Sequence, residues 1–408
     1  MKPLGVYIHI PFCVRKCLYC DFVSYAGQEH LVRDYFEALR REWEWYRQHE
    51  LLSAYHPDTL YVGGGTPSLV TEELVRNAKM NFCIPYEQFQ EATIEVNPGT
   101  ISIAQFQQLR QTGFNRVSIG VQSFHDEELR RLGRIHTSAE AMTCFEAARR
   151  AGFQNISLDV IFGIPDSTLE TWESTLHAAL ALQPEHLSTY NLTIEAGTPF
   201  WEQQQQGKLT LPDEDLQLAM YQFAIATLTR AGYEHYEISN FALPGYRCQH
   251  NQIYWRNEEY LGLGAGAHSY LKGCRYWNYA DLETYIRSLV SHTSRLTEDA
   301  ANGTWAVQQG EAANETYALH NPPTVAGAER LDLPGVIGET VIMNLRMLEG
   351  VDMTAFQRRF GQVFEVLFAK PLDKLLALNL VEFSGKWLRL TPKGIYLSNE
   401  VFQEFVKY

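Results

Sequence analysis

Short apolar, β-branched runs alternate with amphipathic stretches through the first half of the chain. Six runs predict strands: GVYIHI at 5–10, TLYVGG at 59–64, EATIEVNP at 91–98, RVSIGVQS at 116–123, NISLDVIFGIP at 155–165 and HLSTYNLTIE at 186–195. Between them, the stretches 29–49, 101–112, 138–151 and 168–182 have helical periodicity. This alternation predicts repeated βα units around a parallel sheet. Because there are six strands and a closed barrel of this type has eight, we expect an α/β fold with an incomplete (β/α)6 TIM-like barrel. A doubly wound open sheet is the alternative.

The pattern changes after a further helical stretch at 213–231. Residues 234–255 and 260–273 are rich in glycine and aromatic residues, which indicates irregular structure near a site. Residues 291–335 are polar and are interpreted as a linker or a surface elaboration. The tail shows three helical patterns and a hairpin, VEFSGKWLRLTPKG, which together predict a helical, winged-helix-like domain. The predicted division is a barrel core at 1–235, a substrate-side segment and linker at 236–335, and a C-terminal domain at 336–408.

Composition narrows the class of protein. The 408 residues are 45% hydrophobic, which is enough for a large packed core in two or three domains. A formal net charge of −14 disfavours nucleic acid as a partner, since phosphate binding depends on Lys and Arg; the same argument disfavours DNA for the winged-helix-like tail. With no leader pattern and no 18-residue apolar window, we expect a cytoplasmic protein without a membrane segment.

Three of the seven cysteines lie close together, at Cys13, Cys17 and Cys20, in a C-x3-C-x2-C pattern. An odd number of cysteines, four of them scattered, does not form a disulfide framework in a chain of this length. Thiolates at this spacing suit a [4Fe–4S] cluster that leaves one iron open to another ligand. The alternative is a zinc site that takes a distant fourth ligand.

The chain resembles the radical S-adenosylmethionine (AdoMet) proteins, and within them the HemN/HemW coproporphyrinogen-dehydrogenase-like family. The resemblance covers roughly the first 270 residues. It depends on six motifs in a fixed order: YIHIPFCVRKCLYC, VGGGTPS, IEVNPGT, SIGVQSF, LGRIH and DVIFGIP. It implies that AdoMet chelates the open iron through its methionine amine and carboxylate. It also implies reductive cleavage to a 5′-deoxyadenosyl radical, with electrons from a protein such as flavodoxin or ferredoxin.

The resemblance also implies which residues bind AdoMet. Tyr7 and Tyr19 match family positions that contact cluster-bound AdoMet; packing beside the cluster is the simpler interpretation of both. Gly64, Gly65 and Thr66 close the second predicted strand, where bare backbone amides and carbonyls suit the methionine ammonium.

Four further residues complete the predicted AdoMet site. Glu95, Gln122 and Asp159 lie near the carboxyl ends of predicted strands, the edge at which α/β barrels bind ligands. Carboxylates there suit ribose hydroxyls, and the planar donor fork of Arg134 suits a carboxylate. The resemblance assigns all four to AdoMet, while satisfied strand-end or surface residues are the alternative.

Two features separate the branches of this family. The dehydrogenase branch typically has C-x3-C-x2-C-x-C after a long N-terminal extension, whereas Phe22 stands at the fourth cysteine position here and twelve residues precede Cys13. Both features are closer to the HemW branch, whose members are regarded as haem chaperones for apo-haemoproteins. The two branches imply two functions, coproporphyrinogen dehydrogenation and haem delivery. A third possible function is another radical reaction on a tetrapyrrole, such as haem ring opening.

That branch has an H-N-x-x-Y-W signature, which this chain shows as HNQIYW from His250 to Trp255. The resemblance makes His250 the candidate haem ligand, with Tyr254 and Trp255 able to pack on a porphyrin face. Without the resemblance, a hydrogen-bonding structural histidine is the default. Cys248 is a second ligand or an inert thiol, His268 is a weaker candidate, and the remaining cysteines, Cys83, Cys144 and Cys274, are read as structural.

Overall fold

The computed structural model describes residues 1–49, 52–79, 88–289 and 322–406. Its contacts divide the chain into two compact units. The first comprises residues 1–159, 192–210 and 259–329, and the second comprises residues 160–191, 211–258 and 330–408. Cys83 and most of the polar stretch at 291–335 lie outside the described residues. The predicted domain boundaries at 235 and 335 stay predictions.

The first unit is built on a largely parallel sheet. Strand β1 (Lys2–Ile10) lies between β4 (Tyr55–Gly64) and β11 (Tyr260–Leu263) and is parallel to both. Strands β5 (Glu91–Val96) and β6 (Arg116–Gln122) extend the sheet, again in parallel. Their burial is nearly continuous, as expected of a sheet with both faces covered.

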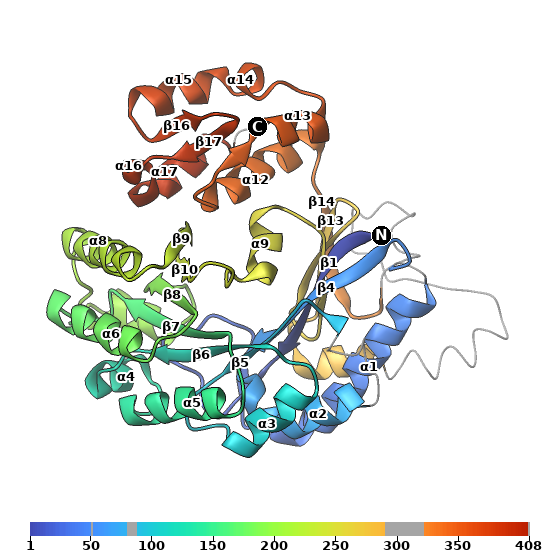
Figure 1. The fold of residues 1–408 in the computed structure, drawn as a ribbon. Coiled ribbons are helices and arrows are strands. Elements are labelled where there is room, and N and C mark those ends of the chain that lie inside the picture. The colour runs from blue at the N-terminus through green and yellow to red at the C-terminus, as the bar shows by residue number, and fades with distance from the viewer. Residues whose placement is uncertain (50–51, 80–87, 290–321, 407–408) are drawn as a thin grey trace. The chain divides into compact units, whose positions relative to one another are not determined.

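Helices connect these strands and cover the sheet. Those of the first unit include α1 (Val32–Gln48), α2 (Thr71–Lys79), α3 (Ile103–Gln111), α4 (Asp126–Leu132), α5 (Ser138–Arg150) and α7 (Pro199–Gln205). In Figure 1, α1, α2 and α3 lie on the outer side of β1, β4 and β5. Capping boxes begin two of the helices, with Ser102 and Gln105 at α3 and Thr137 and Glu140 at α5. The local sequence therefore fixes where these helices start.

The βα alternation continues into the second unit. Strand β7 (Ile156–Phe162) begins in the first unit and ends in the second, and α6 (Leu169–Ala181) and β8 (His186–Asn191) follow. All six predicted strands are therefore present, each followed or preceded by a helix as predicted. After α8 (Glu214–Arg230), strand β10 (Asn240–Ala242) pairs antiparallel with β8 and with β9 (Glu234–Glu237).

Two segments expected to be irregular are ordered, so that expectation is wrong. Residues 249–255 form helix α9 (Gln249–Trp255), whose buried His250 and Ile253 are three residues apart on one face. Residues 260–271 form β11 and β12 (His268–Leu271), which continue into β13 (Cys274–Asn278). The glycines masked the strand signal of Leu261 and Leu263, which alternate with glycine and are fully buried.

The C-terminal segment forms the predicted helical, winged-helix-like module. Its helices are α12 (Leu333–Arg346), α13 (Met353–Phe360), α14 (Phe364–Leu367), α15 (Ala369–Ala377), α16 (Pro392–Tyr396) and α17 (Ser398–Gln403). The predicted hairpin is β16 (Val381–Ser384) and β17 (Trp387–Leu390), and β15 (Val351–Asp352) adds to its edge. An apolar core that includes Phe356, Phe364 and Phe368 holds the module together.

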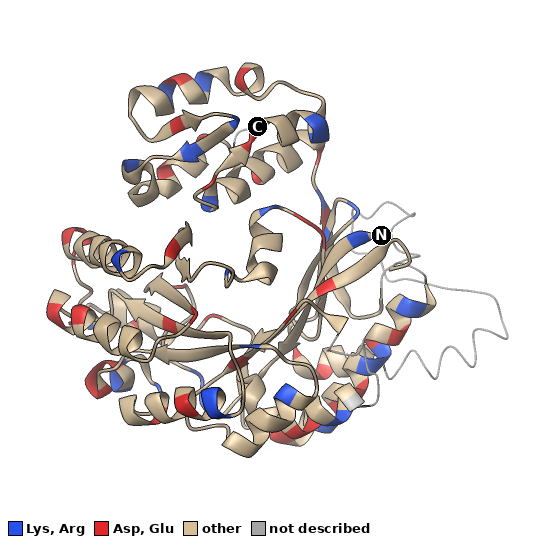
Figure 2. Ribbon diagram, in the orientation of Figure 1, with Lys and Arg blue, Asp and Glu red and all other residues tan. Residues whose placement is uncertain are grey.

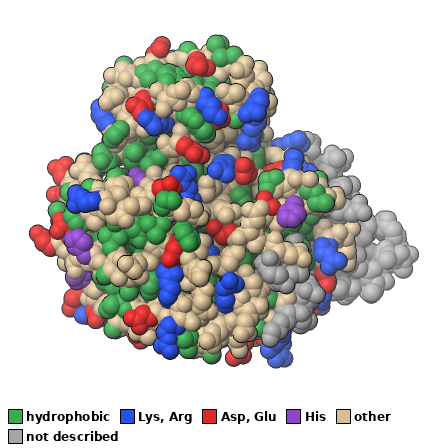
Figure 3. Space-filling view, in the orientation of Figure 1, with side chains coloured by type: hydrophobic (Ala, Val, Ile, Leu, Met, Phe, Trp, Pro, Cys, Tyr) green, Lys and Arg blue, Asp and Glu red, His purple; other side chains and the backbone are tan. Residues whose placement is uncertain are grey.

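Smaller elements complete the fold. They are the parallel bridge of β2 (Phe12–Cys13) with β3 (Tyr25–Ala26), the 3-10 turns at Glu29–Leu31 and Pro67–Val70, a helix at 282–289, and β14 (Val325–Arg330). On the C-terminal module, Lys and Arg are interspersed with Asp and Glu (Figures 2 and 3). In the described part of the chain, no helix combines the length and apolar character needed to cross a bilayer.

Candidate functional site

The three clustered cysteines lie in a loop that leaves the carboxyl end of β1. Cys13 ends strand β2 and is buried, while Cys17 and Cys20 are half-buried in the turn that follows. Thr66 donates a hydrogen bond to the Cys13 Sγ at 3.5 Å, and the Arg134 Nη1 donates to the Cys17 Sγ at 3.6 Å. Two thiols of the loop are thus tied by hydrogen bonds to residues outside it.

The cysteine loop is attached to β1 through His9, which the sequence analysis missed. The His9 Nε2 lies 2.7 Å from the Val23 carbonyl, so this nitrogen carries the proton and donates. The Nδ1 then accepts from the Tyr7 hydroxyl at 2.9 Å. Burial lowers the pKa of His9 to about 4, which keeps the ring neutral. The first predicted AdoMet residue, Tyr7, is therefore held in place by the histidine two positions along the strand.

The glycine run after β4 passes close to both His9 and the cysteine loop. Gly64 has φ +113, and a Cβ there would lie 2.5 Å from the His9 ring. A Cβ on Gly65 would lie 3.0 Å from the Cys13 Sγ and 2.8 Å from the Phe12 carbonyl. Only glycine fits this approach, which brings bare backbone next to a thiol. The predicted role of this run as a close backbone contact thus has a physical basis.

Glu95 is the next-to-last residue of β5 and lies beside the glycine run. Its carboxylate accepts from the Tyr61 hydroxyl at 2.9 Å and from the Gly64 amide at 3.0 Å. Burial, with a further contribution from the negative charge of Asp159, raises the pKa of Glu95 to about 7. A carboxyl group poised in this way can accept hydroxyl hydrogen bonds from a bound ribose.

Arg134 and Asn97 form the most extensive polar contact of the site. The Arg134 Nη2 donates to the Asn97 Oδ1 and to the Gly120 carbonyl, both at 2.7 Å, and the Asn97 Nδ2 donates to the Thr66 Oγ1 at 2.9 Å. A Cβ on Gly120 would lie 2.9 Å from the Gln122 Nε2 and 3.0 Å from Asn97. The structure therefore brings Thr66, Gln122 and Arg134 together around Asn97. The motif IEVNPGT contained Asn97, but nothing in it marked that side chain.

A pocket opens at this contact. Its lining includes Cys17, Thr66, Asn97 and Arg134, together with other residues of the cysteine loop and of the turn after α4. Tyr19 also hydrogen bonds to Arg134 and is half-buried beside the thiols. The pocket therefore combines a cysteine with donors and acceptors of the kind that an amino acid moiety requires.

Asp159, the last predicted AdoMet residue, lies on β7. It accepts from the Ser118 Oγ at 3.1 and 3.0 Å and from the Ser157 Oγ at 3.4 Å. These hydroxyls orient the carboxylate on the strand. Its negative charge contributes to the raised pKa of Glu95.

The candidate haem residues belong largely to the second unit. His250 is 1% exposed on α9, and its Nε2 lies 2.9 Å from the Tyr254 hydroxyl. Cys248 precedes α9 and is fully buried, as a structural cysteine would be. Cys144 and Cys274 are likewise buried, whereas His268 is exposed in the first unit and stacks on Trp277.

The donor set fits a [4Fe–4S] cluster. None of the six described cysteines is in a disulfide, so all three clustered thiols are available. Burial raises the pKa of Cys13 and of Cys20, so their deprotonation is coupled to metal binding. Within the described residues, no three or more His, Cys, Asp and Glu side chains converge as ligands of a single ion. A cubane cluster does not require such convergence, because its three thiolates bind three different irons.

Comparison with known proteins agrees with this geometry. Residues 7–179 match the Radical SAM superfamily model, and residues 331–397 match the HemN C-terminal domain. Heme chaperone HemW of Bacillus subtilis is 34% identical over 98% of this chain and 99% of its own length. Heme chaperone HemW of Escherichia coli is 40% identical over 66% of this chain and 70% of its own. The solved structure of coproporphyrinogen III oxidase (HemN) from Escherichia coli covers 100% of this chain and 91% of its own at 26% identity, with a TM-score of 0.78.

The parallel βα core with its three-cysteine loop is that of a radical SAM protein, and the incomplete (β/α)6 barrel with a C-terminal helical module is confirmed. The [4Fe–4S] cluster and AdoMet are the cofactors of this superfamily. Within it, the chain belongs to the HemW family.

Proposed function

We propose that this protein is a cytoplasmic haem chaperone that holds haem and transfers it to apo-haemoproteins. The observation that carries the proposal is the 34% identity to a heme chaperone along nearly the whole of both chains, which includes the C-terminal module. Free clustered thiols, which need a reducing compartment, support the location.

In this proposal, the cofactors occupy the first unit. Cys13, Cys17 and Cys20 hold the [4Fe–4S] cluster, which when reduced supplies the electron for AdoMet cleavage. In this proposal, the methionine end of AdoMet contacts Tyr7, Tyr19, Gly64, Gly65, Thr66 and Arg134. Its ribose side contacts Glu95, Gln122 and Asp159. The contacts of Arg134 with Asn97 and Cys17 support its assignment, because one guanidinium reaches both the cluster loop and the pocket.

In this proposal, haem binds at helix α9, where the HNQIYW signature makes His250 the candidate haem residue. A porphyrin needs an iron ligand and an apolar or aromatic surface. Helix α9 offers an imidazole and a phenol four residues apart, hydrogen bonded to each other. Client haemoproteins and a reductant such as flavodoxin or ferredoxin complete the set of proposed partners.

The second candidate is oxidative decarboxylation of coproporphyrinogen III. The structural match to coproporphyrinogen III oxidase favours it. Phe22 argues against it, because this residue stands where the dehydrogenase branch typically has a fourth cysteine, and its side chain is 59% exposed.

Anaerobic reconstitution followed by two parallel assays separates the candidates. A haem chaperone binds haem with a Soret band and forms no protoporphyrin from coproporphyrinogen III, AdoMet and reductant. Protoporphyrin at more than one turnover, measured beside a working control enzyme, would overturn the proposal. Cys17→Ala serves as the control for the cluster, since it removes the cofactor site in either case.

A further inference from the structure

Helix α9 presents two candidate ligand atoms to an incoming haem, and they are not equally accessible. The His250 ring is 1% exposed, and its Nε2 is engaged with the Tyr254 hydroxyl at 2.9 Å. Tyr254 is half-buried and thus keeps part of its surface in solvent. Of the two residues, Tyr254 is therefore the more accessible to an iron atom that approaches α9 from solvent.

The geometry of the pair is fixed by the helix. Residues four apart lie on the same face of a helix, one above the other, and the two rings are perpendicular, with centroids 5.1 Å apart and an interplanar angle of 88°. The Nε2 lone pair of a neutral imidazole can accept the phenol proton along this hydrogen bond. His250 is therefore positioned as a proton acceptor for Tyr254.

We infer that the Tyr254 Oη is the atom that binds the haem iron, with His250 behind it as the acceptor of the phenol proton. This inference depends on the proposed haem-chaperone function. As the Fe–O bond forms, the O–H bond breaks and the proton moves to the His250 Nε2, while the iron stays ferric. Phenolate is an established haem ligand, found in catalase.

Neighbouring side chains hold α9 so that this pair keeps its geometry. In the second unit, Asn344 donates to the Trp255 carbonyl at 3.0 Å, and Asn257 donates to the Thr340 Oγ1 at 3.0 Å. The Arg346 guanidinium lies 4.4 Å from the centre of the Trp255 ring. Helix α12 of the C-terminal module thus secures the end of α9, and the Trp255 ring has a structural contact of its own.

The other thiol and imidazole near α9 fit a ligand role less well. Cys248 is fully buried, and its backbone amide donates to the Tyr236 hydroxyl at 3.3 Å, which fixes the start of the helix. His186 is fully buried and hydrogen bonds to the same Tyr236 hydroxyl at 2.8 Å. Neither presents a ligand atom at the surface of the unit.

Ferric haem titrations of the full-length protein test the inference. The wild type is compared with Tyr254→Phe, His250→Ala and the control Tyr246→Phe, each with its cluster reconstituted. Resonance Raman spectra of the wild-type complex are expected to show iron-bound phenolate modes. Tyr254→Phe is expected to lose these modes and to bind haem more weakly by about tenfold or more. Tyr246→Phe is expected to match the wild type.

The possible outcomes distinguish a failure of the Tyr254 assignment from a failure of the proposed haem-chaperone function. A Tyr254→Phe protein that binds haem normally, beside a His250→Ala protein that does not, would make the imidazole the ligand and overturn the inference alone. A wild-type complex without phenolate modes would overturn it without any substitution, so the test survives a variant that fails to fold. A wild type that binds no haem at all would instead overturn the proposed function.

Discussion

Replacement of Glu42 by Gln tests the reasoning about buried carboxyl groups in the first unit. Glu42 is fully buried on α1 and accepts four hydrogen bonds. Its donors are the Tyr285 hydroxyl and the Asn278 amide, both at 2.6 Å, and the Gly264 amide and the Thr324 hydroxyl, both at 2.9 Å. This carboxyl group therefore joins α1 to segments more than 200 residues away in the chain.

The size of the expected change in unfolding free energy follows from the linkage between proton binding and folding. Burial raises the pKa of Glu42 to about 7 in the folded protein, against an ordinary value of 4.5. Between these values the unfolded chain has lost the proton that the folded protein keeps, so the free energy of unfolding falls as pH rises. A difference of about 2.5 pKa units corresponds to about 3 kcal/mol, at 1.36 kcal/mol per unit. The contribution of protonated Glu42 to the free energy of unfolding is fully present below pH 4.5 and is lost as pH rises to about 7.

Glutamine keeps the size of the side chain and cannot ionise. Urea unfolding at a series of pH values, followed by tryptophan fluorescence, should show the difference between Glu42→Gln and wild type moving by about 3 kcal/mol in favour of the variant from pH 4.5 to pH 8. The comparison isolates Glu42 because Glu95 and Glu237, whose pKa values are also raised, are present in both proteins. A difference that stays constant over this range would refute the reasoning.

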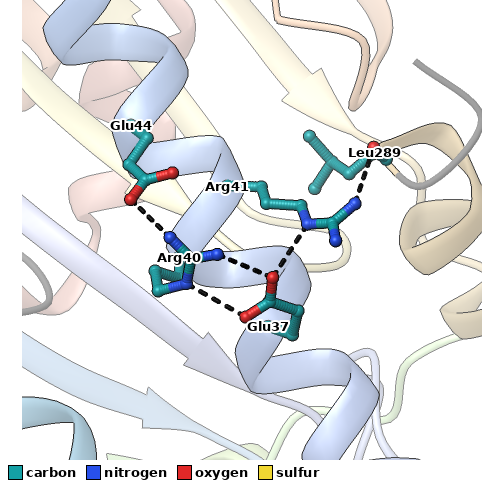
Figure 4. A network of polar contacts seen from close by, with 5 residues as sticks. All are labelled: Glu37, Arg40, Arg41, Glu44 and Leu289. Carbon is teal, nitrogen blue, oxygen red and sulfur yellow. Dashed lines mark hydrogen bonds and ion pairs between the residues drawn. The ribbon is translucent and has the colours of Figure 1, made fainter. Parts of the chain in front are cut away.

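Glu44, two residues along α1, provides the matched control. It is partly buried, with a side chain that is 42% exposed and pairs with Arg40. Arg40 also binds Glu37, and Arg41 connects Glu37 to the Leu289 carbonyl (Figure 4). Exposed ion pairs contribute about 1 kcal/mol or less. Glu44→Gln is therefore expected to change the free energy of unfolding by about 1 kcal/mol or less.

Three further predictions concern the AdoMet site. Gly64→Ala would place a Cβ against the His9 ring at a positive φ, so it should cost about 1–3 kcal/mol of unfolding free energy and weaken AdoMet binding in calorimetry. Arg134→Lys loses the forked contact with Asn97 and the Gly120 carbonyl, so AdoMet binding in equilibrium dialysis should weaken about tenfold while iron content stays at the wild-type level. Because burial lowers the pKa of His9 to about 4, the free energy of unfolding should fall as pH drops from about 6.5 to 4, and His9→Gln should remove that part of the acid dependence.

The sequence predicted the elements whose signals are local. Apolar runs marked β1 and β4 to β8, and the capping residues Ser102 and Thr137 begin helices within a residue or two of the predicted starts. The glycine-rich stretch at 260–273 misled the prediction, because its strand β11 is stabilised by pairing with β1, some 255 residues earlier in the chain. Helix α9 was missed for a similar reason: its short buried face is visible only when packed.

The long-range hydrogen bonds that join the residues of the site could not be predicted from the sequence. Arg134 donates a hydrogen bond to Asn97, which is 37 residues earlier in the chain, and His9 donates one to the Val23 carbonyl, 14 residues later. Such contacts depend on how strands lie beside each other, which no local periodicity reports. The cysteine spacing, by contrast, is a local pattern, so the cluster site could be identified in advance. The pairing of His250 with Tyr254 was open to prediction only once the segment was known to be helical.

Transfer of haem to an acceptor tests the central claim most directly. The haem-loaded protein, with its cluster reconstituted under anaerobic conditions, is mixed with apomyoglobin, and the Soret band is followed over time. The chaperone account predicts a stable haem complex that passes its haem to apomyoglobin, with the rate changed by Tyr254→Phe. A protein that holds no haem, yet converts coproporphyrinogen III with consumption of AdoMet, would contradict it.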